Sequence, residues 1–200
     1  MSIGQFIDGA YMYKALPGCM DYKKLRSHVE SKLGDCIDDA YFFNGDLGDG
    51  STDKLHAALA MPHPRGPGFR VKLYPVQFQE LSWSSRLGGM PVVHPDNHEI
   101  RFRQPRQKGV DVGLAFNMWR SHQNRGWTKL VLGGGDADFS EVVQWLVEEK
   151  NVELHLIGST RSISRHLLQY ARSVFEIDTY PLRAQLRWQR HEHCVEEQFA

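Results

Sequence analysis

The sequence alternates strand-like and helix-like segments from one end to the other, and this order constrains the fold most. Short apolar runs typical of buried strands stand at residues 3–7, 40–43, 69–76, 129–132, 152–157 and 174–177. Apolar residues recur at helical spacing at residues 21–33, 52–61, 110–120, 139–149 and 162–172. The alternation is typical of consecutive βαβ units, so the sequence predicts an α/β fold with a mainly parallel central sheet.

Two segments stand outside this alternation. Residues 77–107 contain a Gly-Gly pair and three prolines, with a hairpin pattern at 92–103, and are too long for a plain connection. Residues 181–200 form a basic tail that is a candidate for a further helix. The chain has the length of one ordinary domain. We therefore expect one domain over 1–180, with an insertion near 77–107 that binds a partner or serves function, and an appended tail.

Composition excludes several classes of protein. Lysine plus arginine equals aspartate plus glutamate at 24 each, so net charge identifies no partner. No run of 18 apolar residues exists, so no membrane span is expected. The three cysteines are widely spaced and form no CxxC pair, which argues against a disulfide framework or a zinc site. With no pattern typical of a signal peptide, we expect a cytoplasmic protein.

Four aspartates are predicted to meet at one end of the sheet. Asp8 directly follows the first strand, whereas Asp136 and Asp138 follow the strand at 129–132 across three glycines. Asp111 lies in the first turn of the helix that precedes that strand. Ligands of open α/β sheets bind beyond the carboxyl ends of the strands, where these side chains are expected.

Crowded carboxylates repel and raise one another's pKa, and a hard divalent cation relieves this cost. Mg²⁺ and Mn²⁺ prefer carboxylate and water oxygens, and such ions activate water for attack on a phosphate. Taken singly, each aspartate could instead be a turn residue or a helix cap. The prediction of a metal site rests on all four projecting from the same sheet end.

Three segments together resemble a known family. They are FIDG at 6–9, KGVDV at 108–112 and GDADF at 135–139, and they are similar to the NYN domain family, which includes LabA-like proteins and belongs to the PIN-like nuclease superfamily. The resemblance covers about residues 3–178. It implies a three-layer α/β/α sandwich and an endonuclease that uses Mg²⁺ or Mn²⁺, with RNA as the usual substrate. It also implies that Asp8, Asp111, Asp136 and Asp138 are the catalytic, metal-binding residues.

Two positions depart from the family's pattern. Tyr11 stands where the family often has asparagine, and Asn117 stands where it often has aspartate. Asn117 could still ligate through its carbonyl oxygen, but it removes one negative charge.

Five residues are candidates for binding substrate, each with a plainer alternative. They are Lys108, Asn117, Ser140, Arg106 and Tyr11. Lys108 and Arg106 could contact phosphates or could be solvated surface charges. Tyr11 could stack on an unpaired base or could belong to the core. Ser140 could orient a phosphate or cap a helix.

These observations lead to three hypotheses. The first is a metal-dependent endoribonuclease that hydrolyses RNA phosphodiester bonds. The second, motivated by Asn117 and Tyr11, is an RNA-binding regulatory module with weak or lost catalysis. The third is a PIN-like nuclease that acts on DNA or structured junctions. RNA is thus the expected partner, with DNA as the alternative; the insertion is also a candidate surface for a homodimer, and no membrane partner is expected.

Overall fold

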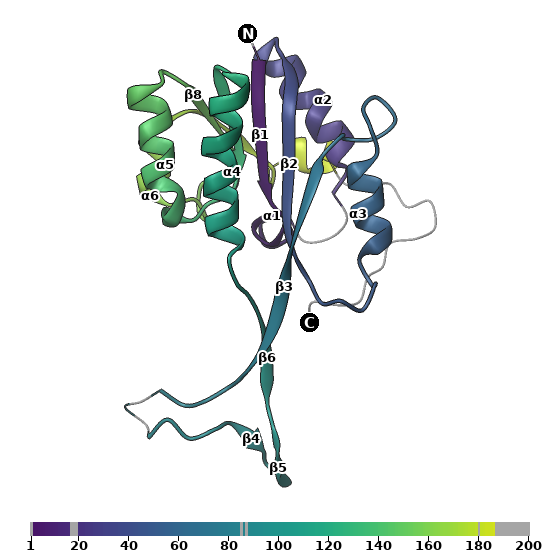
Figure 1. Cartoon of the computed structure of the whole chain (residues 1–200), viewed down its shortest axis with the longest axis vertical. Coiled ribbons are helices and arrows are strands. Elements are labelled where there is room, and N and C mark those ends of the chain that lie inside the picture. Colours follow the sequence, from purple (N-terminus) through teal and green to yellow (C-terminus); the bar gives the residue numbers. More distant parts are fainter. Residues whose placement is uncertain (1, 17–19, 85, 87, 180, 187–200) are drawn as a thin grey trace.

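The computed structural model describes residues 2–16, 20–84, 86, 88–179 and 181–186, which form a three-layer sandwich around a seven-stranded sheet (Figure 1). The strands lie in the order β6-β3-β2-β1-β7-β8-β9. Their bounds are β1 Ser2–Asp8, β2 Cys36–Asp46, β3 Arg70–Glu80, β6 Arg103–Gln107, β7 Lys129–Gly133, β8 Glu153–Gly158 and β9 Ala171–Glu176. All neighbours pair in parallel except β6, which runs antiparallel to β3. The predicted mainly parallel α/β fold is therefore confirmed.

Helices cover both faces of the sheet (Figure 1). One layer holds α4 (Val110–Arg125), α5 (Ser140–Gln144) and α6 (Arg165–Leu168), and the other holds α1 (Gly9–Ala15), α2 (Tyr22–Leu33), α3 (Asp53–Ala60) and α7 (Leu182–Leu186). Two core clusters result, because successive strand residues face opposite sides. In β1, Phe6 joins the α4 side while Ile3 and Ile7 join the α2 side. None of the described helices is long and apolar enough to cross a membrane.

The sequence-based elements differ from the structure at several places, and three of these differences have a clear physical cause. Residues 9–15 form α1, because Asp8 accepts hydrogen bonds from the backbone N–H groups of Ala10 and Tyr11 and so caps a helix. Strand β2 continues to Asp46, beyond the run predicted at 40–43, because its parallel pairing with β3 continues to Pro75. The helix predicted at 162–172 shrinks to α6, which begins after the cap Ser164.

The prediction for the tail can be compared only in part. Helix α7 agrees with a helical start of the tail, and residues 187–200 lie outside the described residues, as do Cys19 and Cys194. Cys36 is an exposed free thiol.

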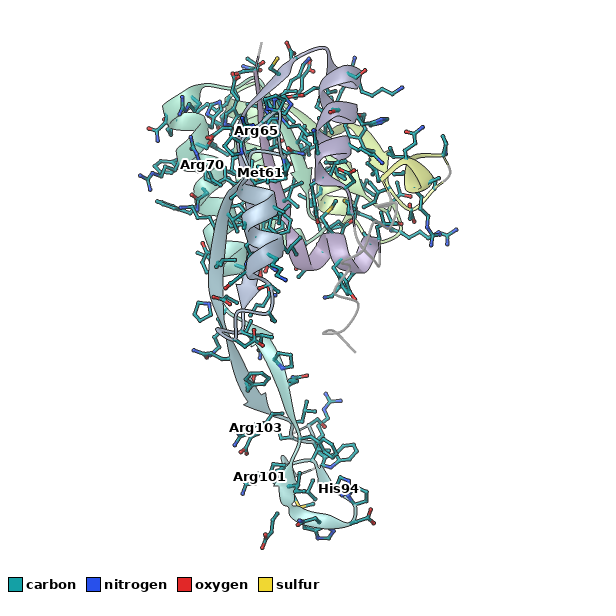
Figure 2. All side chains as sticks on the ribbon, turned by 90° about the vertical axis from the view of Figure 1, so that its right-hand side faces the viewer. Met61, Arg65, Arg70, His94, Arg101 and Arg103 are labelled. Atoms are coloured by element: carbon teal, nitrogen blue, oxygen red, sulfur yellow. The ribbon has the colours of Figure 1, made fainter. Side chains whose placement is uncertain are left out.

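The segment after the third strand forms a projecting ribbon. Strand β3 extends past the end of β2 and pairs there with β6, from Val76 opposite Gln107 to Glu80 opposite Arg103. A small hairpin of β4 (Val93–His94) and β5 (Asn97–Arg101) follows, within the predicted hairpin region. Figures 1 and 2 show residues 76–107, which we call the arm, reaching away from the body. The hairpin was predicted, but the ribbon that carries it was not.

Candidate active site

An open pocket of about 530 Å³ lies where β1 and β7 end. Asp8, Asp111 and Asp136 line it, each from a different part of the chain. They come from the end of β1, the first turn of α4 and the loop after β7. The structure therefore brings three of the four predicted aspartates into one pocket, as expected for the carboxyl ends of parallel strands.

Asp8 combines a structural contact with a place in the pocket. Its Oδ1 atom accepts hydrogen bonds from the N–H groups of Ala10, at 2.9 Å, and Tyr11, at 3.1 Å. Burial raises the pKa of Asp8, the bond from Tyr11 opposes this rise, and the Asp111 carboxylate adds to it. Asp8 is thus both the cap of α1 and a partly buried carboxylate that faces another carboxylate.

Asp111 interacts electrostatically with the other three aspartates of the site. Burial raises the pKa of Asp111, and the carboxylates of Asp136 and Asp138 raise it further. Asp138 lies beside the pocket rather than in its lining.

The Oδ1 atom of Asp136 accepts the N–H of Asp138 at 3.1 Å and caps the short turn Ala137–Phe139. Of the two aspartates that could act as a cap here, Asp136 caps this short turn.

The carboxylates surround the pocket without forming a closed metal cage. Among the described side chains, no three of His, Cys, Asp or Glu meet in a group that would hold a metal ion as they stand. Asp8 and Asp136 each use one oxygen for a cap, which leaves the other carboxylate oxygen available. Such an oxygen donor set fits a hard cation that keeps several water ligands and binds only one or two carboxylates directly.

Tyr11 forms one wall of the pocket. Its hydroxyl lies 2.9 Å from Ser162 Oγ, which joins α1 to the loop after β8. The ring packs so closely on Gly135 that a Cβ there would lie 2.5 Å from the ring atom Cε2. Gly135 is not among the glycines with positive φ, so its role is to admit this ring rather than to make a sharp turn.

Two cations and a serine loop also line the pocket and were missed by the sequence analysis. The residues are Lys14 on α1 and Arg161, Ser162 and Ser164 in the loop after β8. Ser162 and Ser164 were assigned to the helix predicted at 162–172, although they lie before α6 in the loop that follows β8. Arg161 stands just beyond the predicted strand at 152–157, and that position is the signal that could have found it. Lys14 lies on α1, which the sequence analysis did not predict.

Four of the predicted substrate-binding residues lie outside the pocket lining. Lys108 is exposed between β6 and α4, and Arg106 on the arm donates to Gln79 Oε1 at 3.1 Å. The Ser140 hydroxyl donates to the Ala137 carbonyl. Asn117 donates its amide to the Gly113 carbonyl at 2.7 Å within α4. Their roles in binding substrate stay predictions.

We expect Asp8→Asn to raise the melting temperature of the metal-free protein at pH 7. Asparagine keeps the oxygen that caps α1 but removes a partly buried charge whose pKa lies above its ordinary value of 3.8. Because the pKa of Asp8 is higher in the folded protein, the folded state binds this proton more tightly than the unfolded chain does. The stabilisation from the bound proton is fully present below pH 3.8 and is lost as pH rises through the folded-state pKa. The gain over wild type should therefore shrink as pH falls from 7 toward 4, which thermal melts monitored by circular dichroism would measure.

The matched control for that variant is Asp21→Asn. Asp21 caps α2 by accepting the N–H of Lys24, but its carboxylate lies 3.6 Å from the Lys24 ammonium instead of facing other acids. This variant should show no gain at pH 7. An equal gain in both variants would contradict the attribution to crowded carboxylates.

Comparisons with known proteins bear on this site. A crystal structure of a protein of unknown function from Vibrio parahaemolyticus superposes with a TM-score of 0.59 at 20% identity, covering 86% of this chain and 90% of that one. This likeness shows a shared fold. MurG from Acinetobacter baumannii superposes with a TM-score of 0.38 at 8% identity, over 86% of this chain and 40% of its own, too low to indicate a shared fold. A search of curated proteins finds no significant match.

The family model of the NYN domain matches residues 2–178, nearly all of the chain that the structure describes. That range includes the three segments whose resemblance suggested the family and all four aspartates. The three-layer sandwich around a mostly parallel sheet agrees with the fold of PIN-like nucleases. The chain therefore belongs to the NYN domain family, within the PIN-like nuclease superfamily.

Proposed function

We propose that this protein is an endoribonuclease that uses Mg²⁺ or Mn²⁺. The observation that carries the proposal is the pocket itself, in which Asp8, Asp111 and Asp136 meet from three separate elements. Their mutual repulsion favours a bound cation, since a divalent ion removes the cost of holding the charges together. The NYN family is generally nuclease-like, which agrees with this reading.

The aspartates would hold the metal and the two cations would hold the substrate. When bound, the metal lowers the pKa of water and offsets the charge that develops on the phosphate. Asp8, Asp111 and Asp136 would orient the ion through carboxylate oxygens, with Asp138 adding negative charge nearby.

Lys14 and Arg161 supply positive charge at the same pocket. An arginine guanidinium matches the geometry of phosphate oxygens, whereas a lysine acts as a point charge. Together they would position the RNA backbone over the carboxylates. The bond between Tyr11 and Ser162 would keep the wall of the pocket in place during this contact.

The direct test is cleavage of end-labelled oligonucleotides by the full chain. We expect internal cuts in single-stranded RNA with Mn²⁺ or Mg²⁺ and none with EDTA. Single-stranded DNA and flap substrates, tested in parallel, should be cut more slowly. Faster cleavage of DNA or flaps would replace the ribonuclease proposal with the DNA or junction nuclease. Cutting at the same rate in EDTA would overturn the role of the metal.

The Arg161→Ala variant should weaken RNA binding and lower its dependence on salt. Removing one phosphate contact reduces the slope of log affinity against log salt by about 1. Fluorescence anisotropy over a salt series would measure it. Arg165→Ala is the control, because Arg165 is also exposed but lies on α6 outside the pocket lining. Equal slopes for the two variants would rule out the Arg161 contact.

Two observations favour a second function, RNA binding without cleavage. Asn117, where the family often has an acid, directs its amide into its own helix, and the described acids form no ready-made cage for a metal. Tight RNA binding without metal-stimulated cleavage of any substrate in the series above would favour this function over the nuclease.

A further inference from the structure

The arm exposes more apolar surface than a two-stranded ribbon can cover. Five large side chains on it are exposed by two fifths or more: Phe78 59%, Trp83 53%, Met90 64%, Ile100 51% and Phe102 40%. A two-stranded ribbon is marginally stable in water unless it packs on something else. Figure 1 shows no described helix or strand of the body alongside the arm. None of the described elements of the body therefore covers these side chains, which makes the arm a candidate surface for a partner.

Helix α4 presents a second apolar surface on its outer side. Val112, Phe116 and Trp119 are 75%, 54% and 43% exposed and recur at helical spacing. The rings of Phe116 and Trp119 lie 5.8 Å apart, so they form one patch. Leu114 and Met118, on the opposite side of the helix, are fully buried in the core. A helix that covers a sheet normally has a polar outer side, so this patch also indicates a contact.

The charges of the arm favour a protein partner over a nucleic acid. Arg101 lies 2.8 Å from the Glu80 carboxylate, and Arg103 lies 3.6 Å from it. Arg106 is bonded to Gln79. Figure 2 shows Arg101 and Arg103 on the outer part of the arm. The shared Glu80 carboxylate offsets part of the charge of Arg101 and Arg103, which reduces their attraction to phosphates, whereas the aromatic and aliphatic side chains remain uncovered.

We propose that a second copy of this chain covers both surfaces, with the arm of each copy packed on the outer side of α4 of the other. The two surfaces belong to one chain and have the same apolar chemistry. Exchanging them reciprocally makes two equivalent contacts and closes the assembly at a dimer with two-fold symmetry.

The dimensions fit this arrangement. The extended segment from Val76 to Trp83, which is β3 as far as Glu80, spans about 24 Å at roughly 3.4 Å per residue. The patch from Val112 to Trp119 is only about 10 Å long at 1.5 Å per residue. A large aromatic side chain carries about 150–250 Å². Each copy contributes eight exposed side chains, five on the arm and three on α4, and about half of each is exposed. Covering that exposed half would bury on the order of 800 Å² per copy, which is the area that a stable interface of standard size needs.

The first experiment measures the mass of the full chain by sedimentation velocity over a range of concentrations. Wild type should be a dimer. Phe78→Ser with Phe102→Ser, the arm variant, and Phe116→Ser with Trp119→Ser, the helix variant, should each weaken association by at least tenfold. Because all four side chains are exposed, circular dichroism should show unchanged folding.

The control places the same change on exposed apolar residues elsewhere. Leu55 lies in α3 and is 47% exposed, and Met61 directly follows α3 and is 44% exposed. Figure 2 shows Met61 on the body, away from the arm. The Leu55→Ser, Met61→Ser variant should remain a dimer. A monomeric wild type, or a dimer that neither the arm variant nor the helix variant weakens, would overturn the proposal.

The second experiment mixes the two weakened variants. In a mixed dimer, the intact arm of the helix variant meets the intact α4 of the arm variant, so one of the two contacts is restored. The mixture should therefore associate more tightly than either variant alone. Association no tighter than that of the single variants would overturn the packing of the arm on α4, because arm-on-arm or helix-on-helix contacts predict that result.

The competing occupant is RNA, and a third measurement distinguishes it. Wild type and the arm variant are titrated against a labelled single-stranded RNA in EDTA, where cleavage is not supported. If the arm binds a second copy, wild type and the arm variant should bind this RNA with equal affinity per protein chain. A monomeric wild type whose RNA affinity falls tenfold in the arm variant would assign the arm to RNA instead. Neither result depends on nuclease activity, so the proposal stands or falls separately from the proposed function.

Discussion

The Asp136→Asn, Asp138→Asn double variant is expected to lose RNA cleavage by a factor on the order of 10² or more, the scale of removing a group that stabilises developing charge. Both changes remove negative charge from the surroundings of Asp111. Asparagine keeps an oxygen at Asp136 that can still accept the N–H of residue 138 and cap the turn. The rate of single-turnover cleavage in Mn²⁺, with the circular dichroism spectrum beside it, measures the effect apart from folding.

A matched pair of aspartates provides the control for that experiment. Asp46 ends β2 and Asp49 follows it, and each accepts a backbone N–H of a turn, from Gly48 at 2.9 Å and Ser51 at 3.0 Å. Neither lines the pocket. Their double change to asparagine should leave the cleavage rate within about twofold of wild type. Cleavage at the wild-type rate by the Asp136, Asp138 variant would remove these residues from the active site.

The Trp127→Ala variant is expected to destabilise the protein by about 3–5 kcal/mol, the usual cost of emptying a buried tryptophan site. Trp127 is fully buried, and its indole N–H donates to Ser121 Oγ at 2.9 Å. Its ring lies so close to Gly4 that a Cβ there would be 2.5 Å from Cε2. The indole thus fills a space that β1 leaves open. Urea denaturation followed by circular dichroism would measure the loss.

The size of that effect should depend on the volume that is removed. Trp127→Phe keeps most of the ring contact with Phe6, whose centroid lies 5.9 Å away, but loses the hydrogen bond to Ser121. We expect a smaller loss of roughly 1–2 kcal/mol. Equal losses for the alanine and phenylalanine variants would show that the hydrogen bond, rather than the packing, sets the contribution of this residue.

Much of the fold could be predicted from sequence because strand and helix periods are local properties. The apolar runs at 3–7 and 129–132 fall within β1 and β7, and the run at 152–157 matches β8 to within one residue. The same reasoning failed where long-range pairing or a cap decided the outcome. Strand β2 is extended by its partner β3, and α6 is shortened by its cap Ser164. Neither the partner strand nor the use of a side chain as a cap can be read from periodicity.

The four aspartates were chosen from the sequence because parallel strands place their carboxyl ends together. That argument could not separate pocket residues from neighbours. The structure lines the pocket with Asp8, Asp111 and Asp136 and leaves Asp138 beside it. It also adds Lys14, on a helix that the sequence analysis did not predict, and Arg161, in the loop after β8.

The sequence by itself determined the class of fold, the family and the acids that follow the central strands, because each depends on short motifs and local periodicity. Only the tertiary structure decided which of those acids share a pocket and which cations join them. It also decided that residues 76–107 form an arm with uncovered apolar surface. Those outcomes depend on pairing and packing between residues far apart in the chain, which no local pattern records.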